Sequence, residues 1–509
     1  MINSIHIFKT IVILFLMSLA YSSFAQGQVK QFDGNSDVGA VLHRGAVSYD
    51  EEKQEYTISG SGSNIWGSHD EFHFAWKKLE GDFILQAHGT LVGKGVDPHR
   101  KTGWMVRNSL DSSSPMVSVQ LHGDGLISLQ YRKTEGGEVE EVRSTISAPD
   151  VLQIERKGNQ YTMSVARFGE PFTKSEVPNL DLGNEVYVGL FVCAHNKDVT
   201  EKARFRNVRI IKPVKEGFTP YRDYIGSHIE TMDVDSGHRT VVYSDPGSLQ
   251  APNWTPDGKA LIYNSSKGLM YRFDLDTRKP QEINTDFVKN NNNDHVISFD
   301  GKMLGLSSSS GKQEYGSLIY TVPIEGGKPK LITPTGPSYL HGWSPDGKYL
   351  TYTGQRNNEF DIYKIASDGS GKEIRLTTHP SLDDGSEYSP DGKYIYFNSV
   401  RTGRMQLWRM KPDGSDQEQL TFDDYNNWFP HISPDGKWIA FLSYMNDIDP
   451  NDHPFYRHVY LRLMPVSGGA PKVIAYVYGG QGSINTPSWS PDSKKIAFVS
   501  NDASLTPKP

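Results

Sequence analysis

The 509-residue sequence predicts an all-β protein in which an antiparallel sandwich precedes a six-bladed propeller. Two observations predict this class. A turn-forming phrase recurs six times in the second half of the chain, and short alternating apolar segments separated by turns fill the first half. The composition agrees, because 48 Gly, 29 Pro and 26 Tyr favour turns and strands over long helices.

The first predicted element is a targeting segment. A polar start precedes the apolar run 10–20, and the small residues Ser23 and Ala25 suit cleavage before Gln26. The run is too short to span a bilayer comfortably, so we expect a signal peptide over 1–25 and no transmembrane segment after its removal. No cysteine stands directly after the run, which argues against a lipid anchor and predicts a periplasmic or secreted protein.

Charge and cysteine content exclude several function classes. A net charge of −7 argues against a nucleic-acid partner, which usually needs a basic patch. Cys193 is the single cysteine, so neither an intramolecular disulfide nor a Cys-clustered zinc site is possible. The sequence holds no Gly-Lys-Ser/Thr phosphate loop and no Gly-x-Ser-x-Gly elbow, so a hydrolase-type peptidase or esterase is not expected.

Residues 28–213 predict the sandwich, and 214–220 read as a linker. The order of phrases in this region resembles the concanavalin-like (laminin-G-type) jelly rolls of secreted carbohydrate-active proteins. The segments that carry the resemblance are 65–66, 70–74, 80–83, 103–107 and 155–159. The resemblance implies a jelly roll that binds a ligand, often a sugar. Trp66 and Trp104 are candidates to stack on a sugar ring, or else to pack in the core.

The second half of the chain carries the repeated phrase Ser/Thr-Pro-Asp-Gly-Lys followed by an apolar strand, with Phe299 in place of the proline in the second copy and Ser493 in place of the glycine in the sixth. Its aspartates are Asp257, Asp300, Asp346, Asp391, Asp435 and Asp492. Proline presets φ, aspartate accepts backbone hydrogen bonds and glycine supplies positive φ, so each phrase predicts a turn between two strands. The spacing of 43 to 57 residues predicts one four-stranded blade per repeat.

The two ends of this region predict how the ring closes. After the last phrase the chain makes only the early strands of a blade before the tail 503–509, whereas 228–233 and 239–243 are strands without a phrase. We therefore expect a six-bladed propeller over 221–502, closed by strands from both ends, which removes exposed sheet edges.

The repeats resemble the TolB-type (PD40, WD40-like) propeller motif Pro-x-Trp-Ser-Pro-Asp-Gly-Lys. The segments 252–257 and 487–492 match it closely. This resemblance implies the propeller fold, but it covers protein-binding scaffolds, peptidase propellers and polysaccharide lyases alike.

Polar side chains gather where the chain enters the first strand of each blade, which predicts a site at the channel mouth. His295 and His341 each precede a repeat serine by three places, and His431 by two, where Glu387 stands in its own blade. The three imidazoles could hold one divalent ion such as Mn²⁺, Zn²⁺ or Ca²⁺, could act as acid or base on a sugar acid, or could make hydrogen bonds between blades. Without the ion, no cofactor is expected.

Other loops at the same mouth supply further candidates. The long segment 444–457 predicts an ordered lid, and arginines near it could grip a carboxylate or sulfate or could pair with surface acids. The predicted catalytic residues are His295, His341, Glu387, His431, Asp384 and Arg404. The predicted substrate-binding residues are Asn293, Asp294, Tyr339, Asp383, Asn427, Trp428, His453, Tyr456, Gln481, Arg356 and Arg401.

Two function hypotheses follow. The first is an exported enzyme that processes an oligo- or polysaccharide, and this substrate could be anionic. The His-rich channel resembles that of oligogalacturonate lyases, which implies β-elimination at a uronate with a His-bound divalent ion; hydrolysis would instead use Glu387 with Asp383 or Asp384. The second is a non-catalytic envelope scaffold, or a propeller that binds glycans or protein partners at its mouth, as the TolB resemblance implies.

Overall fold

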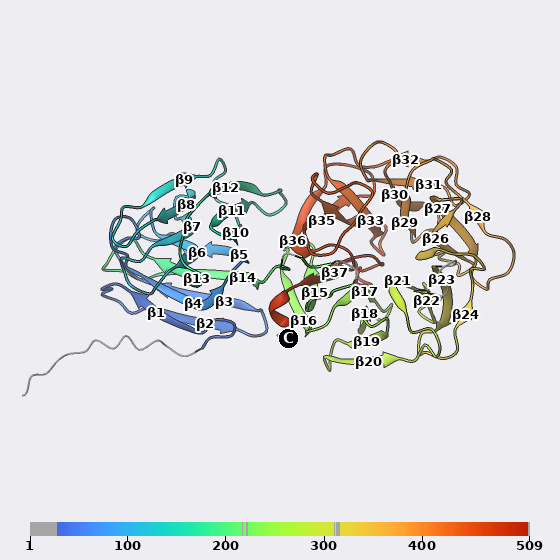
Figure 1. The fold of residues 1–509 in the computed structure, drawn as a ribbon, viewed down its shortest axis with the longest axis horizontal. Coiled ribbons are helices and arrows are strands. Elements are labelled where there is room, and N and C mark those ends of the chain that lie inside the picture. The colour runs from blue at the N-terminus through green and yellow to red at the C-terminus, as the bar shows by residue number, and fades with distance from the viewer. Residues whose placement is uncertain (1–27, 216, 220–221, 310, 312–315, 507–509) are drawn as a thin grey trace, which may run out of the picture.

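The computed structural model describes residues 28–506 except 216, 220–221, 310 and 312–315. Two all-β bodies lie side by side, a sandwich formed by the first part of the chain and a propeller formed by the rest (Figure 1). The predicted fold class is confirmed. The predicted signal peptide lies outside the described residues, and among the residues described no helix has the length and apolarity that crossing a membrane would require.

Two seven-stranded antiparallel sheets form the N-terminal body. The first sheet has the order β1 (Gly34–Val38), β4 (Phe72–Glu80), β13 (Glu185–Cys193), β6 (Lys101–Arg107), β7 (Met116–His122), β8 (Ile127–Arg132) and β9 (Glu140–Arg143). The second sheet has the order β12 (Thr173–Val177), β11 (Gln160–Ala166), β10 (Val151–Lys157), β5 (Phe83–Leu91), β14 (Glu201–Ile211), β3 (Glu55–Gly60) and β2 (Ala46–Asp50).

The sandwich core lies between these sheets, where alternate residues of each strand face inward. Trp104 is completely buried in this core beside Leu190 and Val119, so of its two predicted roles the packing role is correct. Trp66 lies in a loop and keeps 47% of its surface exposed. A buried salt bridge from Asp70 to Arg107 and Arg132 ties this loop region to β6 and β8.

The propeller contains six blades. The first closes the ring with β16 (Arg239–Asp245), β15 (Ser227–Asp233) and β37 (Lys495–Asn501). The five complete blades are β17–β20 (Leu249–Trp254, Ala260–Ser265, Met270–Asp274, Lys279–Ile283), β21–β24 (Asn291–Ile297, Met303–Ser309, Ser317–Pro323, Lys330–Leu331), β25–β28 (Ser338–Trp343, Tyr349–Arg356, Glu359–Ala366, Ile374–Arg375), β29–β32 (Asp383–Tyr388, Ile395–Ser399, Gln406–Met410, Glu418–Gln419) and β33–β36 (Asn426–Ile432, Trp438–Tyr444, Arg457–Pro465, Lys472–Gly479). A short 3-10 helix, η1 (Ala503–Leu505), follows the last strand.

Ring closure follows the predicted plan. The C-terminal strand β37 pairs antiparallel with β15, which pairs with β16, and Trp489 makes a single bridge to Ile496 in the place of an innermost strand. The closing blade therefore takes its inner part from the C-terminal segment and its outer strands from 227–245. The C-terminal strand is thereby paired inside the ring, and β16 forms the outer edge of the closing blade.

The repeated turns explain why the six blades are so regular. In each repeat the Ser or Thr hydroxyl donates to the Asp carboxylate over 2.6 to 2.8 Å, and the Lys backbone N–H donates to the same oxygen over 3.1 Å in every case. The glycine has φ between 70° and 74° in the first five repeats, a region that favours glycine. Ser493 adopts φ of 62° in the sixth.

One buried carboxylate joins the sandwich to the closing blade. Glu230 of β15 accepts hydrogen bonds from Arg239 of β16 (2.6 Å), from Arg209 of the sandwich strand β14 (2.5 Å) and from Ser500 of β37 (2.6 Å). The two guanidinium groups outweigh the effect of burial and hold the pKa of Glu230 far below its usual range. Apolar contacts of Ile84 and Ile211 with Tyr478 extend the same interface.

Replacing Glu230 by Gln should destabilise the protein strongly. The variant leaves two buried guanidinium groups without a carboxylate, a change that costs about 3 to 5 kcal/mol of unfolding free energy in buried ion pairs. Urea unfolding followed by circular dichroism measures it. The matched control Glu359→Gln removes a half-exposed partner of Arg375 and should change the unfolding free energy by less than about 1 kcal/mol. Equal effects of the two substitutions would contradict the role given to Glu230 in joining the sandwich to the closing blade.

Candidate functional site

The inner strand of every complete blade leaves its regular pairing at the channel. Register shifts occur between Gln250 and Asn253, Asn291 and His295, Leu340 and Gly342, Asp384 and Glu387, and Trp428 and His431. Such bulges re-aim side chains and bend the strand. In a regular strand these side chains would lie between neighbouring blades. The bulges turn them toward the central channel instead.

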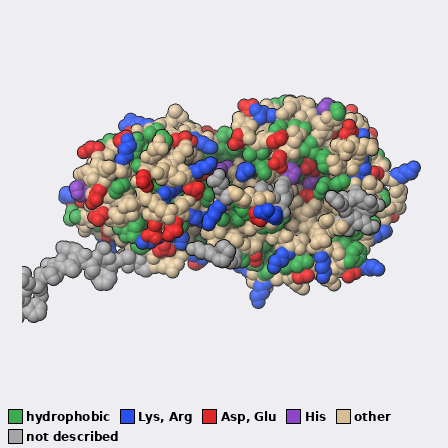
Figure 2. Space-filling view, in the orientation of Figure 1, with side chains coloured by type: hydrophobic (Ala, Val, Ile, Leu, Met, Phe, Trp, Pro, Cys, Tyr) green, Lys and Arg blue, Asp and Glu red, His purple; other side chains and the backbone are tan. Residues whose placement is uncertain are grey.

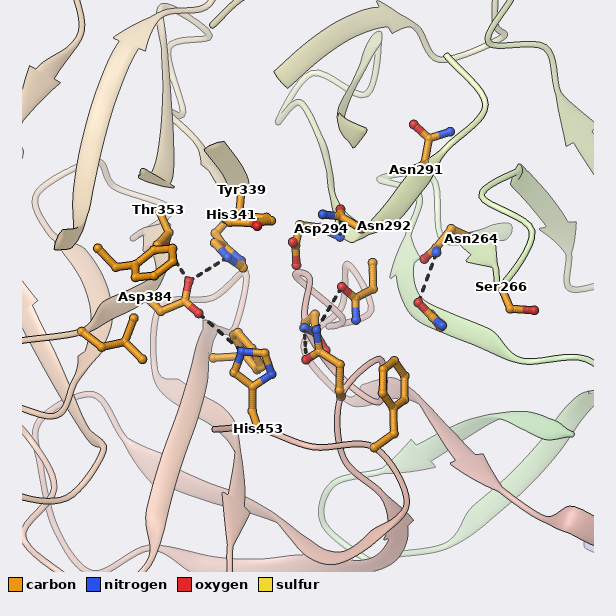
Figure 3. A pocket seen from close by; sticks show the side chains of 18 of the residues that line it. Asn264, Ser266, Asn291, Asn292, Asp294, Tyr339, His341, Thr353, Asp384 and His453 are labelled. Atoms are coloured by element: carbon orange, nitrogen blue, oxygen red, sulfur yellow. Dashed lines mark hydrogen bonds and ion pairs between the residues drawn. The ribbon is translucent and has the colours of Figure 1, made fainter. Parts of the chain in front are cut away.

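These bulges surround a cavity of about 480 Å³ at the channel mouth (Figure 3). Most of its lining is polar but uncharged. The lining residues are Tyr224, Gln250, Asn264, Ser265, Ser266, Asn291, Asn292, Asn293, Asp294, Tyr339, His341, Thr353, Phe360, Leu382, Asp384, Phe429, Asn451, His453, Phe455, Gln481 and Asn485. Neither Lys nor Arg occurs among these described lining residues.

A buried ion pair forms one wall of the cavity. The Nε2 atom of His341 lies 3.1 Å from Oδ1 of Asp384, which also accepts from the Thr353 hydroxyl (2.6 Å) and the Gly385 N–H (2.8 Å). Burial disfavours the charged imidazole, but Asp384 outweighs burial and raises the pKa of His341 to about 9. Burial likewise opposes ionisation of Asp384, and His341 overcomes it and lowers the pKa of Asp384 to about 2.

Two further titratable groups face this pair. Asp294 points toward the cavity beside His341 (Figure 3), and burial raises its pKa to about 6, with Asp384 adding to the rise. His453, from the segment between β34 and β35, places Nε2 3.9 Å from Oδ2 of Asp384. Burial lowers the pKa of His453, and Asp384 opposes that shift. The wall therefore combines two carboxylates, one imidazolium and one imidazole that favours the neutral form.

Several buried polar atoms of the cavity have no hydrogen-bond partner within the protein. They are Asn264 Oδ1, Ser265 Oγ, Asn291 Oδ1, Asn293 Nδ2, His341 Nδ1 and His453 Nδ1. A buried polar atom without a partner costs about 1 to 3 kcal/mol, so proteins rarely collect such atoms in one place. Their concentration around one cavity indicates that the cavity is built to hold a hydrogen-bonding guest.

The prediction that three histidines share a ligand is wrong. His341 reaches the cavity, but Nε2 of His295 lies 3.4 Å from the Ile262 carbonyl oxygen of the neighbouring blade. His431 uses both ring nitrogens, one on Glu387 at 2.7 Å and one on the Ile484 carbonyl at 2.8 Å. The reason is the register. His295 ends its bulge and pairs with Leu306, whereas His341 lies inside its bulge.

The predicted catalytic set divides accordingly. His341 and Asp384 stand together in the cavity, whereas His295, Glu387 and His431 make contacts between blades. Within the described part of the chain, no three His, Cys, Asp or Glu side chains are grouped so that they could hold a metal ion. A bound divalent ion stays a prediction from the sequence, and the imidazole set that suggested it is not brought together.

The predicted arginine grip is also absent from the cavity. Arg356 pairs with Glu373 at 2.8 Å, Arg401 pairs with Asp383 at 2.8 Å, and Arg404 lies 3.9 Å from the exposed Asp424. None of the three lines the cavity. The alternative, pairing with acids of the chain, describes all three arginines, but only the Arg404 pair lies at the surface, and Asp383 is buried in its pair with Arg401.

Of the other predicted binding residues, Asn293, Asp294, Tyr339, His453 and Gln481 line the cavity. The remaining three do not. Asn427 bonds to Thr421, Gln406 and Asp423, the fully buried Trp428 packs edge-on against the His453 ring at 4.4 Å, and the Tyr456 hydroxyl accepts from the Ile225 N–H.

Sequence reasoning missed part of the site. Gln250, Asn264 and Ser266 come from the blade β17–β20, whose entering segment carries no histidine, and Phe360 comes from β27. The Asn264-Ser-Ser run after the apolar strand 260–263 was a usable signal, because it places polar residues on the loop that joins two strands at the mouth.

Comparisons with known proteins agree with the repeats. The family model of the TolB beta propeller domain (PD40) matches residues 221–374 and 341–452. An uncharacterized protein of Agrobacterium fabrum is 47% identical over 275 residues, which cover 54% of this chain and 92% of that protein. A TolB-like protein from Agrobacterium tumefaciens has a solved structure that is 45% identical, with a TM-score of 0.52, and covers 55% of this chain and 99% of its own.

A more distant similarity is to an oligogalacturonate lyase solved in complex with manganese. That structure is 15% identical, has a TM-score of 0.38, and covers 55% of this chain and 84% of its own.

His341 should be the charged histidine of the cavity at neutral pH. Because its pKa is raised, its contribution to stability is complete below about pH 6.5 and disappears as the pH rises through about 9. Nitrogen NMR of ¹⁵N-histidine-labelled protein should show an imidazolium at pH 7.5. Asp384→Asn removes the group that raises this pKa most, so burial is then opposed only by the weaker effects of Asp294 and the Asn485 backbone, and the pKa of His341 should fall. His295, with a pKa of about 4, is the internal control and should stay neutral. A neutral His341 at pH 7.5 in the unaltered protein would refute the assignment.

Proposed function

Because this chain belongs to the family of TolB-type β-propeller proteins, we propose that it is a non-catalytic binding protein that holds a segment of a partner protein in the mouth of its channel. One observation carries the proposal. A cavity of about 480 Å³ at the mouth is lined by amide, hydroxyl and imidazole groups, six of whose buried polar atoms have no partner within the protein.

The charge of the cavity argues against the uronate-processing hypothesis. A sugar carboxylate needs a cation to bind, and such sites usually offer arginine. The three predicted arginines pair elsewhere, and the one imidazolium at the wall is already neutralised by Asp384. Asp294 would repel the substrate. The lyase resemblance therefore finds no support in the charges of the site.

The kind of polar group favours a polypeptide guest. Asn and Gln side chains each offer a donor and an acceptor, so they can bond to the N–H and C=O groups of an extended backbone. Sugar rings instead stack on open aromatic faces. The Phe429 ring, the aromatic ring nearest the ion pair, is 1% exposed, stacks on His341 at 5.7 Å and meets His453 at 5.5 Å, so it offers no open face to a sugar. Other aromatic side chains, among them Tyr339 and Phe360, line the rest of the cavity.

The visible surface has no broad region of one charge. On the face drawn in Figure 2, acidic and basic side chains are interspersed over both bodies. A partner would therefore be selected by the groups inside the cavity rather than by a broad field. We propose an envelope protein as the partner, because the apolar run 10–20, outside the described residues, resembles an export signal.

The N-terminal body supports a second candidate function. Its two-sheet architecture agrees with the proposed concanavalin-like identity, and Trp66 presents a large exposed aromatic surface. We propose that a glycan, if the protein binds one, stacks on Trp66 rather than in the propeller mouth. Such binding should be lost in Trp66→Ala and kept in variants of the mouth.

Selection of peptides from a random display library on the full protein tests the main proposal. Ser266 lies at the edge of the cavity (Figure 3), and Ser266→Trp adds an indole at this edge without removing a side-chain hydrogen bond of Ser266. The selected peptides should bind this variant at least tenfold more weakly than the unaltered protein, as measured by calorimetry.

The control for this experiment lies at the repeat turns. Lys348→Trp adds the same indole at an exposed turn and should leave the affinity unchanged. Thermal unfolding confirms that both variants are folded. If no selected peptide distinguishes Ser266→Trp from Lys348→Trp, the proposal fails; if neutral oligosaccharides do so instead, the guest is a glycan and the protein-binding proposal is overturned.

A further inference from the structure

The Asp294 carboxylate is the charged group of the mouth that lacks a matched partner. Its backbone N–H is held by the Asn292 side chain at 3.1 Å, and its place inside the bulge of β21 turns it toward the cavity. Asp384 has His341, Thr353 and Gly385 as partners, whereas the groups that stabilise the ionised Asp294 are the charge of His341, which Asp384 shares, and the Asn485 amide.

The charges of the cavity therefore do not balance. At neutral pH Asp384 and His341 cancel, His453 favours its neutral form, and no Lys or Arg occurs among the described lining residues. The ionised Asp294 leaves an excess of one negative charge in the cavity. A guest that brings a cation would remove this excess, and an anionic guest would add to it.

The neutral lining fits the same guest. Two acceptors in the cavity, Asn264 Oδ1 and Asn291 Oδ1, have no donor within the protein. A primary ammonium group has three donors and no acceptor, so it can use a carboxylate and amide oxygens together. Tyr339 and Phe360 add aromatic surface, which favours a cation over an anion.

We propose that the mouth recognises a primary ammonium group of the partner segment, either a lysine side chain or the N-terminal amine, through the carboxylate of Asp294. This inference rests on the proposed function, since it names the group that the bound segment must carry. It predicts that free amines are enriched among peptides that bind the mouth.

Acetylation of the selected peptides tests the inference. Peptides that lose affinity in Ser266→Trp are prepared with the α-amine acetylated or with each lysine ε-amine acetylated, which distinguishes the two sources of ammonium. One of the two forms should bind the unaltered protein at least tenfold more weakly. Asp294→Asn should cause a similar loss for the free-amine peptide and almost none for the acetylated peptide, because both changes remove the same charge pair.

Two controls separate the charge pair from general effects. Asp452→Asn removes an exposed carboxylate of the segment between β34 and β35, next to His453, and should change the affinity less than twofold.

The groups that face Asp294 are His341, Asp384, Tyr339 and Asn485, with His453 beyond Asp384. Lowering the pH from 7.5 to 5 protonates Asp294, whose pKa is about 6, so affinity for the free amine should fall while His341 and Asp384 keep their charges.

The pH effect should vanish in Asp294→Asn. If the pH effect persists in Asp294→Asn, another titratable group such as His453 causes it, and the inference is wrong. If acetylation and Asp294→Asn leave the affinity unchanged while Ser266→Trp still abolishes binding, the ammonium inference fails and the proposed function stands. If no peptide is sensitive to Ser266→Trp, the proposed function fails and the ammonium inference with it.

Discussion

The architecture depends on a single buried carboxylate at the seam of the ring. A propeller closed by strands from distant parts of the chain must hold those strands together without a covalent link. Glu230 does this by accepting from β16, from β37 and from the sandwich strand β14 at once. The same group that closes the ring therefore also fixes the sandwich against it, so the two bodies are joined where the propeller would otherwise open.

The position of this seam has a consequence for the mouth. The segment just before β37 carries Gln481 and Asn485, and both line the cavity. The Asn485 amide donates to Gln481 Oε1 at 3.0 Å, and Gln481 reaches Asn293 Oδ1 of the blade that starts at β21 at 3.3 Å. Closing the ring therefore completes the hydrogen-bond network around the guest site as well as the last blade.

The number of blades could be predicted because it follows from local chemistry. The turn of each Ser/Thr-Pro-Asp-Gly phrase is held by contacts within five residues, such as Thr255 to Asp257 and Ser344 to Asp346, so the phrase marks one strand pair wherever it occurs. Strand counting at the two ends then leaves one way to close the ring. The jelly-roll connectivity of the N-terminal body has no comparable local marker, and the sequence supported only its two-sheet, antiparallel character.

The site could be predicted only in part, because bulges decide which side chains reach it. His295 and His341 occupy the same place relative to the repeat serine, yet the bulge of β21 ends at the first and the bulge of β25 contains the second. A shift of this kind depends on pairing with the next strand, which a period-2 pattern does not encode. The structure therefore has a polar cavity where the sequence predicts a site, but of the three histidines expected to share it only His341 lines it.

The charges at the mouth also bear on how the site could have arisen within a structural repeat. His431 and Glu387 show what the equivalent places do when they serve packing, since they bond to each other between neighbouring blades. Asp384 and His341 form a similar pair between β29 and β25, but a bulge turns theirs toward the cavity. Asp294 then adds a carboxylate to a pair that is already neutral. A His–carboxylate pair that elsewhere stabilises the contact between two blades thus lies in the cavity because of one β-bulge. Since this pair is neutral overall, the single charge of Asp294 can select what binds there.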